Sequence, residues 1–382
     1  PYAKSPEWII PGKALFYASA IPRVGGGTPL VVHTFEGRPT HLQGNKLHPD
    51  SNGGLDSQAQ ASILNLYDPN RAQVFLNSGK KANREDFLKF LDAKKAELAG
   101  KQGAGLAILT DEAVTPTRAR LLGELLKKFP QAKFYSHEVF GQGNVKAAYA
   151  AAFGPGTVPA YKFEAADRVF ALDADFIGLD RLGNKSVGQF MSRRKADSPE
   201  DGDKMNRLYA VEARYTLTGG MADHRLRVHS SQTLKIAVKL AEKIAEKTGD
   251  AGLKAAASAV KLVGSYSPRA DYEAWVQAAA DDLAEKKGAS LVVAGSQHAP
   301  ELHLLTIAIN QALGAFGKII EVKQVQSAPA GSLADLAKAS AEKQIDTLIA
   351  LGETDPLFEA PADLVPGGLA AALKNVPHFI VD

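Results

Sequence analysis

The chain has 382 residues with 45% hydrophobic and 23% charged side chains, an ordinary globular composition, and its length allows two or three domains with their own cores. Its formal net charge of +3 argues against a nucleic-acid surface or an anchor for anionic membranes, and its apolar runs are too short for direct membrane insertion. The absence of cysteine excludes disulfides, thiolate zinc sites and cysteine-ligated iron–sulfur clusters from this chain.

Residues 1–72 are rich in proline and glycine and contain two runs typical of extended chain, Pro29–Thr34 and Thr40–Gln43. They predict a small β-containing module. Three histidines lie in or beside the predicted hairpin: His33, His41 and His48. Such a group suits a metal site, and it equally suits polar positions on a solvent-facing hairpin, so both interpretations stay open.

From about residue 105 onward, short apolar runs alternate with segments of helical periodicity. The runs are rich in Val and Ile, as strands buried on both faces require. The predicted strands are 105–110, 132–136, 168–173, 207–212, 290–295, 318–322, 346–352 and 378–381. Helical periodicity lies between them, as at Thr117–Phe129, Thr233–Thr248 and Glu301–Leu313. The alternation predicts an α/β fold with parallel sheets covered by helices on both faces.

Two glycine-rich segments fall short of nucleotide-binding motifs. In a P-loop the lysine directly follows a glycine, but in residues 178–186 Asn184 lies between that glycine and Lys185. Residues 141–146 carry two of the three glycines of a dinucleotide fingerprint. We therefore expect no nucleotide hydrolysis. The polar residues 184–206 predict a long surface excursion.

Acidic residues near the predicted strands are candidates for chemistry. Asp173 and Asp175 end the predicted strand 168–173, and the carboxyl ends of parallel strands are where such sheets bind ligands. Paired carboxylates suit catalysis there, and a single carboxylate equally suits a helix cap. The charged run Met221–Arg225, which includes Asp223, fits either ion pairs that order a loop or a former ligand role.

Residues 30–71 hold a more specific combination of turn motifs. The motifs are Gly44–Asn45, His48–Pro49, Gly53–Gly54 and the closing "LYDPNR" at 66–71. This segment resembles the first module of the molybdopterin bis-guanine-dinucleotide oxidoreductases. Further segments resemble the remainder of that fold, and they are 165–178, 207–241, 291–321 and 345–364.

The residues that carry chemistry in that family are replaced here. The resemblance places its clustered cysteines within 19–27 and at about Asp56, its electron-relaying lysine at about Gln58 and its guanine-reading acid at Gln232. It therefore implies a vestigial cofactor cleft, with no catalytic residue and no metal ligand. The candidate residues of that cleft are Gly44, Asn45, Asp56, Gln58, Asp173, Asp223 and Gln232.

The resemblance also implies a molybdopterin-oxidoreductase-like architecture with two Rossmann-like parallel-sheet subdomains, one inserted in the other. The expected divisions are the N-terminal module 1–72, the first half of one subdomain at 73–145, the inserted subdomain at 146–285 and the second half at 286–382. Strands 168–173 and 207–212 are expected to form the sheet of the inserted subdomain. The other six predicted strands are expected to share one sheet.

Four motifs together narrow the resemblance to one subgroup. "ASILNLYDPNR", "LDADFIG", "MNRLYAVE" and "GGMADHRLRV" resemble the B subunit of bacterial alternative complex III, a quinol:electron-acceptor oxidoreductase. This implies a non-catalytic scaffold on the periplasmic side of the inner membrane, with other subunits of the respiratory complex, cytochrome c-type subunits among them, as partners. No cofactor is expected in this chain. Iron–sulfur clusters are expected in a C-terminal domain beyond Asp382.

Two other functions remain open at this point. The first is an active molybdopterin-dependent oxidoreductase in which Asp56 or Ser57 replaces cysteine as metal ligand, although nothing upstream of them could deliver electrons. The second is a small-molecule-binding module that uses the emptied cleft. Molybdenum and pterin in the purified protein would identify the first of these, and ligand screening would identify the second.

Overall fold

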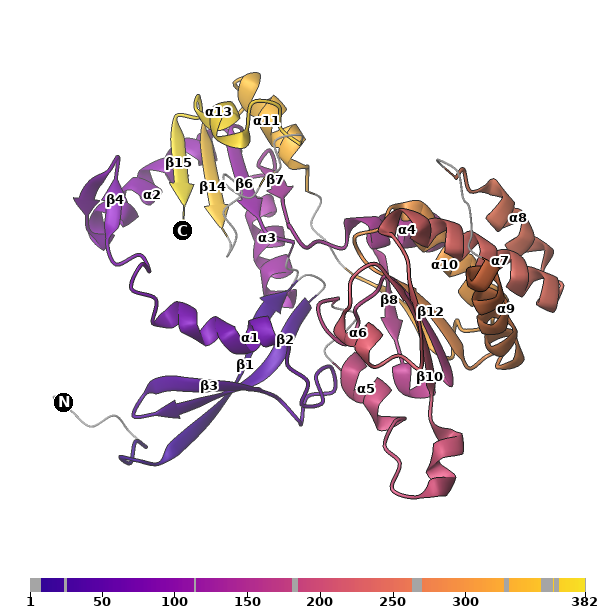
Figure 1. The fold of residues 1–382 in the computed structure, drawn as a ribbon. Coiled ribbons are helices and arrows are strands. Elements are labelled where there is room, and N and C mark those ends of the chain that lie inside the picture. Colours follow the sequence, from indigo (N-terminus) through magenta and orange to yellow (C-terminus); the bar gives the residue numbers. More distant parts are fainter. Residues whose placement is uncertain are drawn as a thin grey trace. The chain divides into compact units, whose positions relative to one another are not determined.

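The computed structural model describes residues 8–23, 26–112, 115–180, 185–262, 270–325, 330–351, 360 and 364–381. The chain forms two compact units (Figure 1). Unit 1 contains Pro1–Gln43, Asp56–Gly141 and Gln326–Asp382, and unit 2 contains Gly44–Leu55 and Gln142–Val325. Within the described ranges, no helix combines the length and the apolar character needed to cross a bilayer.

Unit 1 contains a small N-terminal module and a parallel sheet with helices. Its elements are β1 (Ala14–Arg23), β2 (Gly26–Phe35), β3 (Arg38–Gly44), α1 (Ser57–Ala61), η1 (Ser62–Leu66), β4 (Phe75–Asn77), β5 (Lys80–Ala82), α2 (Arg84–Gly100), β6 (Leu106–Thr110), α3 (Pro116–Lys128), β7 (Lys133–Ser136), α11 (Leu333–Ala341), β14 (Thr347–Leu351), α13 (Leu369–Leu373) and β15 (His378–Val381). The larger sheet has the order β15-β14-β6-β7, and its neighbouring strands are parallel. The small sheet has the order β1-β2-β3. Glu36 and Gly37, with φ of 51° and 76°, make the tight turn between β2 and β3.

Unit 2 is built around a second parallel sheet. Its elements are α4 (Gly143–Phe153), β8 (Thr157–Tyr161), η2 (Phe163–Ala165), β9 (Arg168–Leu172), α5 (Ser186–Ser192), η3 (Pro199–Lys204), β10 (Arg207–Glu212), α6 (Leu217–Gly220), β11 (His224–Arg227), η4 (Ser230–Gln232), α7 (Thr233–Thr248), α8 (Ala251–Ala259), α9 (Ala270–Glu285), β12 (Ser290–Ala294), α10 (Pro300–Ala312) and β13 (Ile320–Gln324). The main sheet has the order β11-β10-β9-β12, with all pairs parallel, and β13 pairs antiparallel with β8.

The central strand β9 shows why these apolar runs become buried strands. Phe170 and Leu172 pack into one hydrophobic core with α7, α9 and α10, whereas Val169 and Ala171 pack into the core on the opposite face. Successive side chains of a strand point to opposite faces, so a strand covered on both faces must be apolar throughout. The predicted α/β class with parallel sheets is confirmed.

The predicted membership of the sheets is partly right. Strands β6, β7, β14 and β15 share one sheet, and β9 and β10 share the other, as expected. The placement of 290–295 and 318–322 in the first sheet is wrong. Ser290–Ala294 pairs with Arg168–Leu172 in unit 2, and β13 pairs with β8 outside both main sheets. The chain consequently rejoins unit 1 at Gln326, beyond the expected division at residue 286.

The predicted excursion at 184–206 contains short helices anchored by arginines. Residues 181–184, which include part of the near P-loop segment, lie outside the described residues. Arg193 Nη2 donates to Asp167 Oδ1 over 2.7 Å. Arg194 pairs with both carboxylate oxygens of Asp223 over 2.9 and 2.6 Å. These bonds tie the excursion to the amino edge of the sheet, where Asp223 also accepts from the amide of Leu208.

Candidate functional site

The carboxyl edge of the unit 2 sheet is the candidate site. The four main strands are parallel, so the residues that follow them gather at one edge, which is where open α/β sheets bind ligands. Polar side chains that end or follow β9, β10 and β12 gather there, together with Arg225 from within β11 and Thr218 of α6. We call them the carboxyl-edge cluster: Asp173, Asp175, Glu212, Thr218, Arg225 and His298.

Asp173 follows β9 in an unusual backbone conformation. Its φ of 50° is rare for a residue with a side chain, although Asp tolerates it better than most. Its amide donates to the Val211 carbonyl over 2.7 Å, and its carbonyl accepts from Gln297 Nε2 over 2.8 Å. A Cβ on Gly295 would lie 2.1 Å from that carbonyl, so only glycine fits after β12. These contacts fix the Asp173 side chain at the edge.

The Asp173 carboxylate faces the ends of three other strands. Its Oδ1 accepts from the Ala213 amide and its Oδ2 from Ser230 Oγ, each over 3.4 Å. His298 Nε2 lies 3.3 Å from Oδ2. Burial alone raises the pKa of Asp173, but the histidine and the two donors Ala213 and Gln297 outweigh burial, so the net pKa is lowered. Asp173 is therefore an ionised acceptor at neutral pH.

Asp175 performs a structural task. It is 8% exposed, and its Oδ1 accepts from the amide and the hydroxyl of Thr218 over 3.0 and 2.9 Å. Its Oδ2 accepts from the Leu179 amide over 3.0 Å. The carboxylate thus joins the loop after β9 to the first turn of α6. Of the two interpretations left open by the sequence, the structural one describes Asp175, although the N-cap of α6 is Thr216 and not Asp175.

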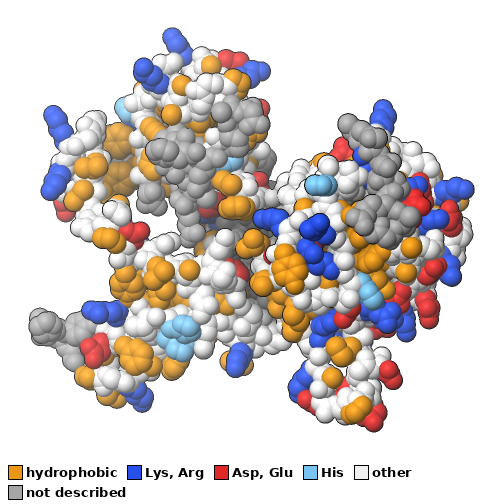
Figure 2. All heavy atoms as spheres, viewed as in Figure 1, with side chains coloured by type: hydrophobic (Ala, Val, Ile, Leu, Met, Phe, Trp, Pro, Cys, Tyr) orange, Lys and Arg blue, Asp and Glu red, His pale blue; other side chains and the backbone are white. Residues whose placement is uncertain are grey.

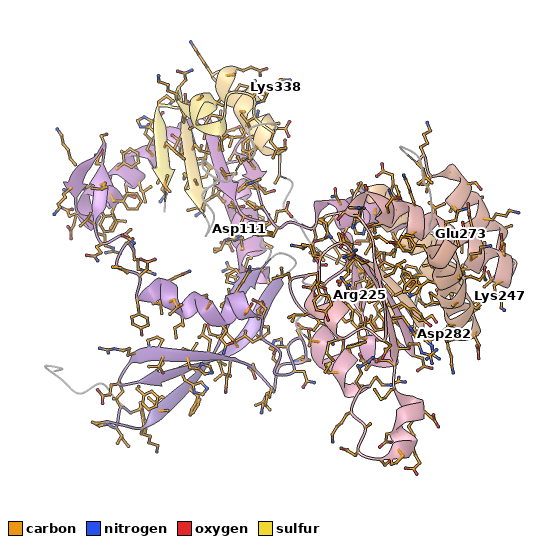
Figure 3. All side chains as sticks on the ribbon, in the orientation of Figure 1. Asp111, Arg225, Lys247, Glu273, Asp282 and Lys338 are labelled. Carbon is orange, nitrogen blue, oxygen red and sulfur yellow. The ribbon has the colours of Figure 1, made fainter. Side chains whose placement is uncertain are left out.

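Glu212, at the end of β10, is the most deeply buried acid of the cluster. It is 3% exposed and accepts from Thr216 Oγ1 over 2.6 Å and from Arg225 Nε over 2.5 Å. Arg225 is labelled in Figure 3. A Cβ on Gly219 would lie 1.8 Å from Glu212 Oε1, so the "TGG" turn closes directly over the carboxylate. The Arg225 guanidinium also lies 4.6 Å from the centre of the Tyr215 ring.

Asp223 and Gln232, two predicted cleft residues, occupy different edges of this sheet. Asp223 precedes β11 and lies at the amino edge, where Arg194 engages its carboxylate. Burial, the largest single influence, raises the pKa of Asp223, but the hydrogen bonds from Arg194 and the Leu208 amide, with the charge of Arg194, together outweigh burial and lower the pKa. Gln232 ends η4 at the carboxyl edge, two positions after Ser230. The ordered-loop interpretation of Met221–Arg225 therefore describes Asp223.

Gly44 and Asn45 close a compact loop in unit 2. The Asn45 carbonyl accepts from the Gly53 amide over 3.1 Å and from Ser51 Oγ over 2.8 Å. A Cβ on Gly44 would lie 2.2 Å from the Gly53 carbonyl oxygen. The paired glycines at 53–54 thus allow the chain to pass directly against Gly44, which explains why these turn motifs occur together.

Asp56 and Gln58 belong to unit 1 and begin its first helix. Asp56 Oδ1 accepts from the Ala59 amide over 2.7 Å and is the N-cap of α1. Gln58 is exposed on that helix. The position expected for the fourth cysteine therefore has a local role, and the position expected for the relay lysine carries a neutral amide.

The histidines of the N-terminal segment are arranged as a pair and a single residue. The rings of His33 and His41 pack edge to face with centroids 5.2 Å apart, as the predicted hairpin requires. His48 Nδ1 accepts from the Asp50 amide over 3.2 Å within the loop of unit 2. Among the described residues, no group of three or more potential metal ligands comes together.

Unit 1 has two polar features that lie apart from this edge. Asp111, which follows β6, forms an ion pair with Arg118 of α3. A cavity of about 600 Å³ lies along β7 and is lined by Tyr135, Asp335 and Lys338 among others. Figure 3 labels Lys338. Burial, reinforced by the charge of Asp335, raises the pKa of Tyr135. The cavity also reaches Lys133, the first residue of β7, so it follows the side of the sheet and not its carboxyl edge.

Sequence reasoning missed Glu212, Thr218 and His298. The signal was present, since a polar residue directly follows or ends each of the strands 207–212 and 290–295. The rule that identified Asp173 would have identified His298, had 290–295 been placed in the same sheet. The wrong sheet membership therefore hid the partner of Asp173.

His303 provides a pH-dependent test of this edge. It is 5% exposed in α10, and burial, with the charge of His298 adding to it, lowers the pKa of His303 from 6.5 to about 4. Between these values the unfolded state binds a proton that the folded state does not. We therefore expect the contribution of His303 to the free energy of unfolding to be constant above pH 6.5 and to fall as the pH decreases toward 4.

Urea unfolding followed by tryptophan fluorescence across this pH range measures the slope. His303→Leu removes the titrating group and is expected to flatten the slope between pH 6.5 and about 4. An equal slope in the wild-type and variant proteins would contradict the assignment.

No family model matches this sequence, and no curated protein matches it. Solved structures do match the fold. Acetylene hydratase from Pelobacter acetylenicus aligns with a TM-score of 0.59 at 11% identity over 95% of this chain, which spans 58% of the length of that chain. A formyltransferase/hydrolase complex from Methylorubrum extorquens aligns with a TM-score of 0.43 at 11% identity over 78% of this chain and 84% of that chain. The first match identifies the fold as a mixed α/β, molybdopterin-oxidoreductase-like architecture with Rossmann-like parallel sheets.

Proposed function

We propose that this chain is a non-catalytic molybdopterin-fold scaffold domain of a respiratory quinol:electron-acceptor oxidoreductase, the B subunit of alternative complex III. In this proposal it lies on the periplasmic side of the bacterial inner membrane and contacts other subunits of the complex, including cytochrome c-type subunits. Electrons pass through iron–sulfur clusters held by other parts of the full-length protein.

The observation that carries the proposal is how the acidic side chains are used. Asp175 accepts three hydrogen bonds from its own loops, and Glu212 is buried under the Gly219 turn with Arg225 as counter-ion. Asp56 caps a helix. Carboxylates that already accept these hydrogen bonds stabilise the fold, and few of their lone pairs remain free to bind a substrate or a metal.

The donor set also fits a molybdopterin cofactor poorly. Without cysteine, the chain has no thiolate for molybdenum or for a cluster that would exchange electrons with it. At the guanine-reading position, Gln232 replaces a carboxylate by a neutral amide, which forfeits a charge-assisted hydrogen bond of about 1.5–3 kcal/mol. Each of these losses lowers the expected affinity of the chain for the cofactor. Together they also leave the cofactor without a group that could exchange electrons with it.

Metal and pterin analysis tests the proposal. The chain is produced in a host that makes the molybdopterin cofactor, beside a catalytic molybdopterin enzyme as positive control. We expect a colourless protein with molybdenum, iron and pterin far below one per chain, since oxygen and nitrogen donors do not assemble cubane clusters. Molybdenum and pterin near one per chain would instead establish the active oxidoreductase. A metal-free chain whose unfolding temperature rises with an unrelated small molecule would establish the binding module.

A further inference from the structure

The short helix α6 buries one side and exposes the other. Thr218 is 1% exposed, and its amide and hydroxyl both donate to Asp175. Leu217 and Met221 are four positions apart, and the Met221 amide donates to the Leu217 carbonyl over 3.1 Å, so both lie on the same side of the turn. They are 64% and 38% exposed. Two large hydrophobic side chains therefore face solvent on a turn that is firmly attached to the sheet.

Tyr215 lies just before this turn and is exposed but held in place. It is 75% exposed, yet its ring packs against the Arg225 guanidinium, 4.6 Å from the ring centre. A Cβ on Gly220 would lie 3.8 Å from the ring, so the ring also lies beside the backbone of the turn. Arg225 is itself fixed by its ion pair with the buried Glu212. An aromatic ring that is already positioned loses little conformational entropy when a partner covers it.

Two arginines beside Tyr215 have no counter-ion. Arg214 is its neighbour in the chain, and Arg227 lies opposite Glu212 in the pairing of β10 with β11, on the same face of β11 as Arg225. Both arginines are exposed. Within the described part of the chain, neither guanidinium forms a hydrogen bond or an ion pair. Their positive charges are therefore available to a partner.

The two segments that carry these arginines provide no free carboxylate. Residues 213–222 and 224–241 contain no acidic side chain. Glu212 and Asp223, which immediately precede these segments, are already paired with arginines. Figure 2 shows Lys and Arg side chains beside hydrophobic ones over α6, which Figure 1 labels. We call this surface the α6 patch, and its members are Arg214, Tyr215, Leu217, Met221 and Arg227.

The composition of the α6 patch fits a protein partner. Tyr, Arg and Met are enriched in protein interfaces, and a well-packed Tyr or Arg is a typical residue for contributing much of the affinity. We infer that the α6 patch binds an acidic segment of a partner protein. Apolar side chains of that segment contact Tyr215 and Leu217, and its carboxylates pair with Arg214 and Arg227. Only the identity of the partner, as another subunit of the respiratory complex, rests on the proposed function.

Other occupants fit the α6 patch less well. A typical DNA-binding surface contacts about 6–10 phosphates, and an anionic membrane likewise requires many cations. The patch offers two arginines without a counter-ion, and its remaining members are exposed hydrophobic side chains. A second copy in a two-fold contact would place the patch against itself, which brings the arginines of both copies together without a carboxylate.

Synthetic peptides test the inference on the intact chain. The probe is fluorescein-labelled Asp-Glu-Leu-Phe-Asp-Glu. One control, Asn-Gln-Leu-Phe-Asn-Gln, removes its charges, and the other, Asp-Glu-Ser-Ser-Asp-Glu, removes its apolar centre. Fluorescence anisotropy at about 0.1 M salt is expected to show each control binding about five- to tenfold more weakly than the probe, because either the ion pairs or the apolar contacts are lost.

Variants of the α6 patch locate the binding. Tyr215→Ala is expected to weaken binding of the probe about tenfold, whereas Tyr215→Phe keeps the ring and is expected to retain it. Arg214→Glu combined with Arg227→Glu is expected to remove the preference for the acidic probe over the uncharged control. Lys254→Glu and Leu304→Ser, at exposed positions of α8 and α10, are the matched controls and are expected to bind as the wild type does. Circular dichroism verifies that every variant remains folded.

Four results would overturn the inference. They are no binding of the probe at millimolar concentration, equal affinity for the three peptides, and unchanged affinity in both Tyr215→Ala and the double arginine variant. The fourth is a labelled DNA oligonucleotide, an anionic lipid vesicle or a second copy of the chain that binds more tightly than the probe and is released by the double arginine variant. None of these results changes the metal and pterin content on which the scaffold function depends, so the two proposals fail separately.

Discussion

Replacing Arg225 by methionine is expected to lower the free energy of unfolding of unit 2 by about 3 kcal/mol. Glu212 has 4% of its side chain exposed, and Arg225 Nε lies 2.5 Å from its Oε1. Removing one partner of a buried ion pair leaves the other charge without compensation in a low-dielectric environment, which costs about 3–5 kcal/mol. Thr216 still donates to the carboxylate, so the lower end of that range applies.

Trp275 allows this effect to be measured in unit 2. The chain has two tryptophans, and Trp275 packs against Phe170 and Tyr209, with ring centroids 5.8 and 5.7 Å away. In a Trp8→Phe background it is the sole tryptophan. Its fluorescence during urea unfolding then reports on this unit alone, which matters because a chain of two units need not unfold in one step.

Two further variants separate the buried pair from charge removal in general. Lys239→Met removes a cation from the Lys239–Glu242 pair on the surface of α7, where the side chains are 38% and 36% exposed. It is expected to change the free energy by less than about 0.5 kcal/mol. Arg225→Met combined with Glu212→Leu removes both buried charges and is expected to recover most of the loss. A loss below about 0.5 kcal/mol for Arg225→Met alone would show that Glu212 does not depend on its cation.

The sequence predicted the strands of this fold better than it predicted their partners. The run "SLVVA" at 290–294 is apolar at every position after Ser290, which identifies a strand buried on both faces. The same pattern would serve in either parallel sheet, because hydrophobic periodicity carries no information about the neighbouring strand. Its pairing with β9 depends on the helices α9 and α10 that cover it, and these contacts are long-range.

The sequence predicted which residues of the candidate site lie at strand ends, but it did not predict the role of each residue. Asp173 was correctly placed at a carboxyl edge, because a strand and its terminal acid are adjacent in sequence. Asp223 was not, since the short β11 that follows it has only four residues and its direction could not be inferred. The division of roles between Asp173 and Asp175 depends on Thr218 and His298, which lie far along the chain.

Replacing Asp175 by alanine is expected to cost about 3–4 kcal/mol of the stability of unit 2, measured by Trp275 fluorescence as above. The change leaves three buried donors without an acceptor, and they are the Thr218 amide, the Thr218 hydroxyl and the Leu179 amide. Each unsatisfied buried donor costs about 1–3 kcal/mol, and the removal of one carboxylate offsets part of the sum. The offset arises because the Asp175 carboxylate repels the nearby Asp180 carboxylate. Burial raises the pKa of Asp180, and the charge of Asp175 raises it further.

The Asp175→Asn variant separates the effect of the lost hydrogen bonds from the effect of the lost charge. Asp175→Asn keeps a carbonyl oxygen for Thr218 and removes the charge beside Asp180, so it is expected to cost about 1–2 kcal/mol and to lower the pKa of Asp180. Asp250→Ala is the matched control, because Asp250 caps α8 by accepting one bond from the Leu253 amide over 2.8 Å. Loss of that single cap is expected to cost about 1 kcal/mol. If Asp175→Ala cost no more than Asp250→Ala, Asp175 would not be the joint between the β9 loop and α6, and its carboxylate would again be available for a ligand.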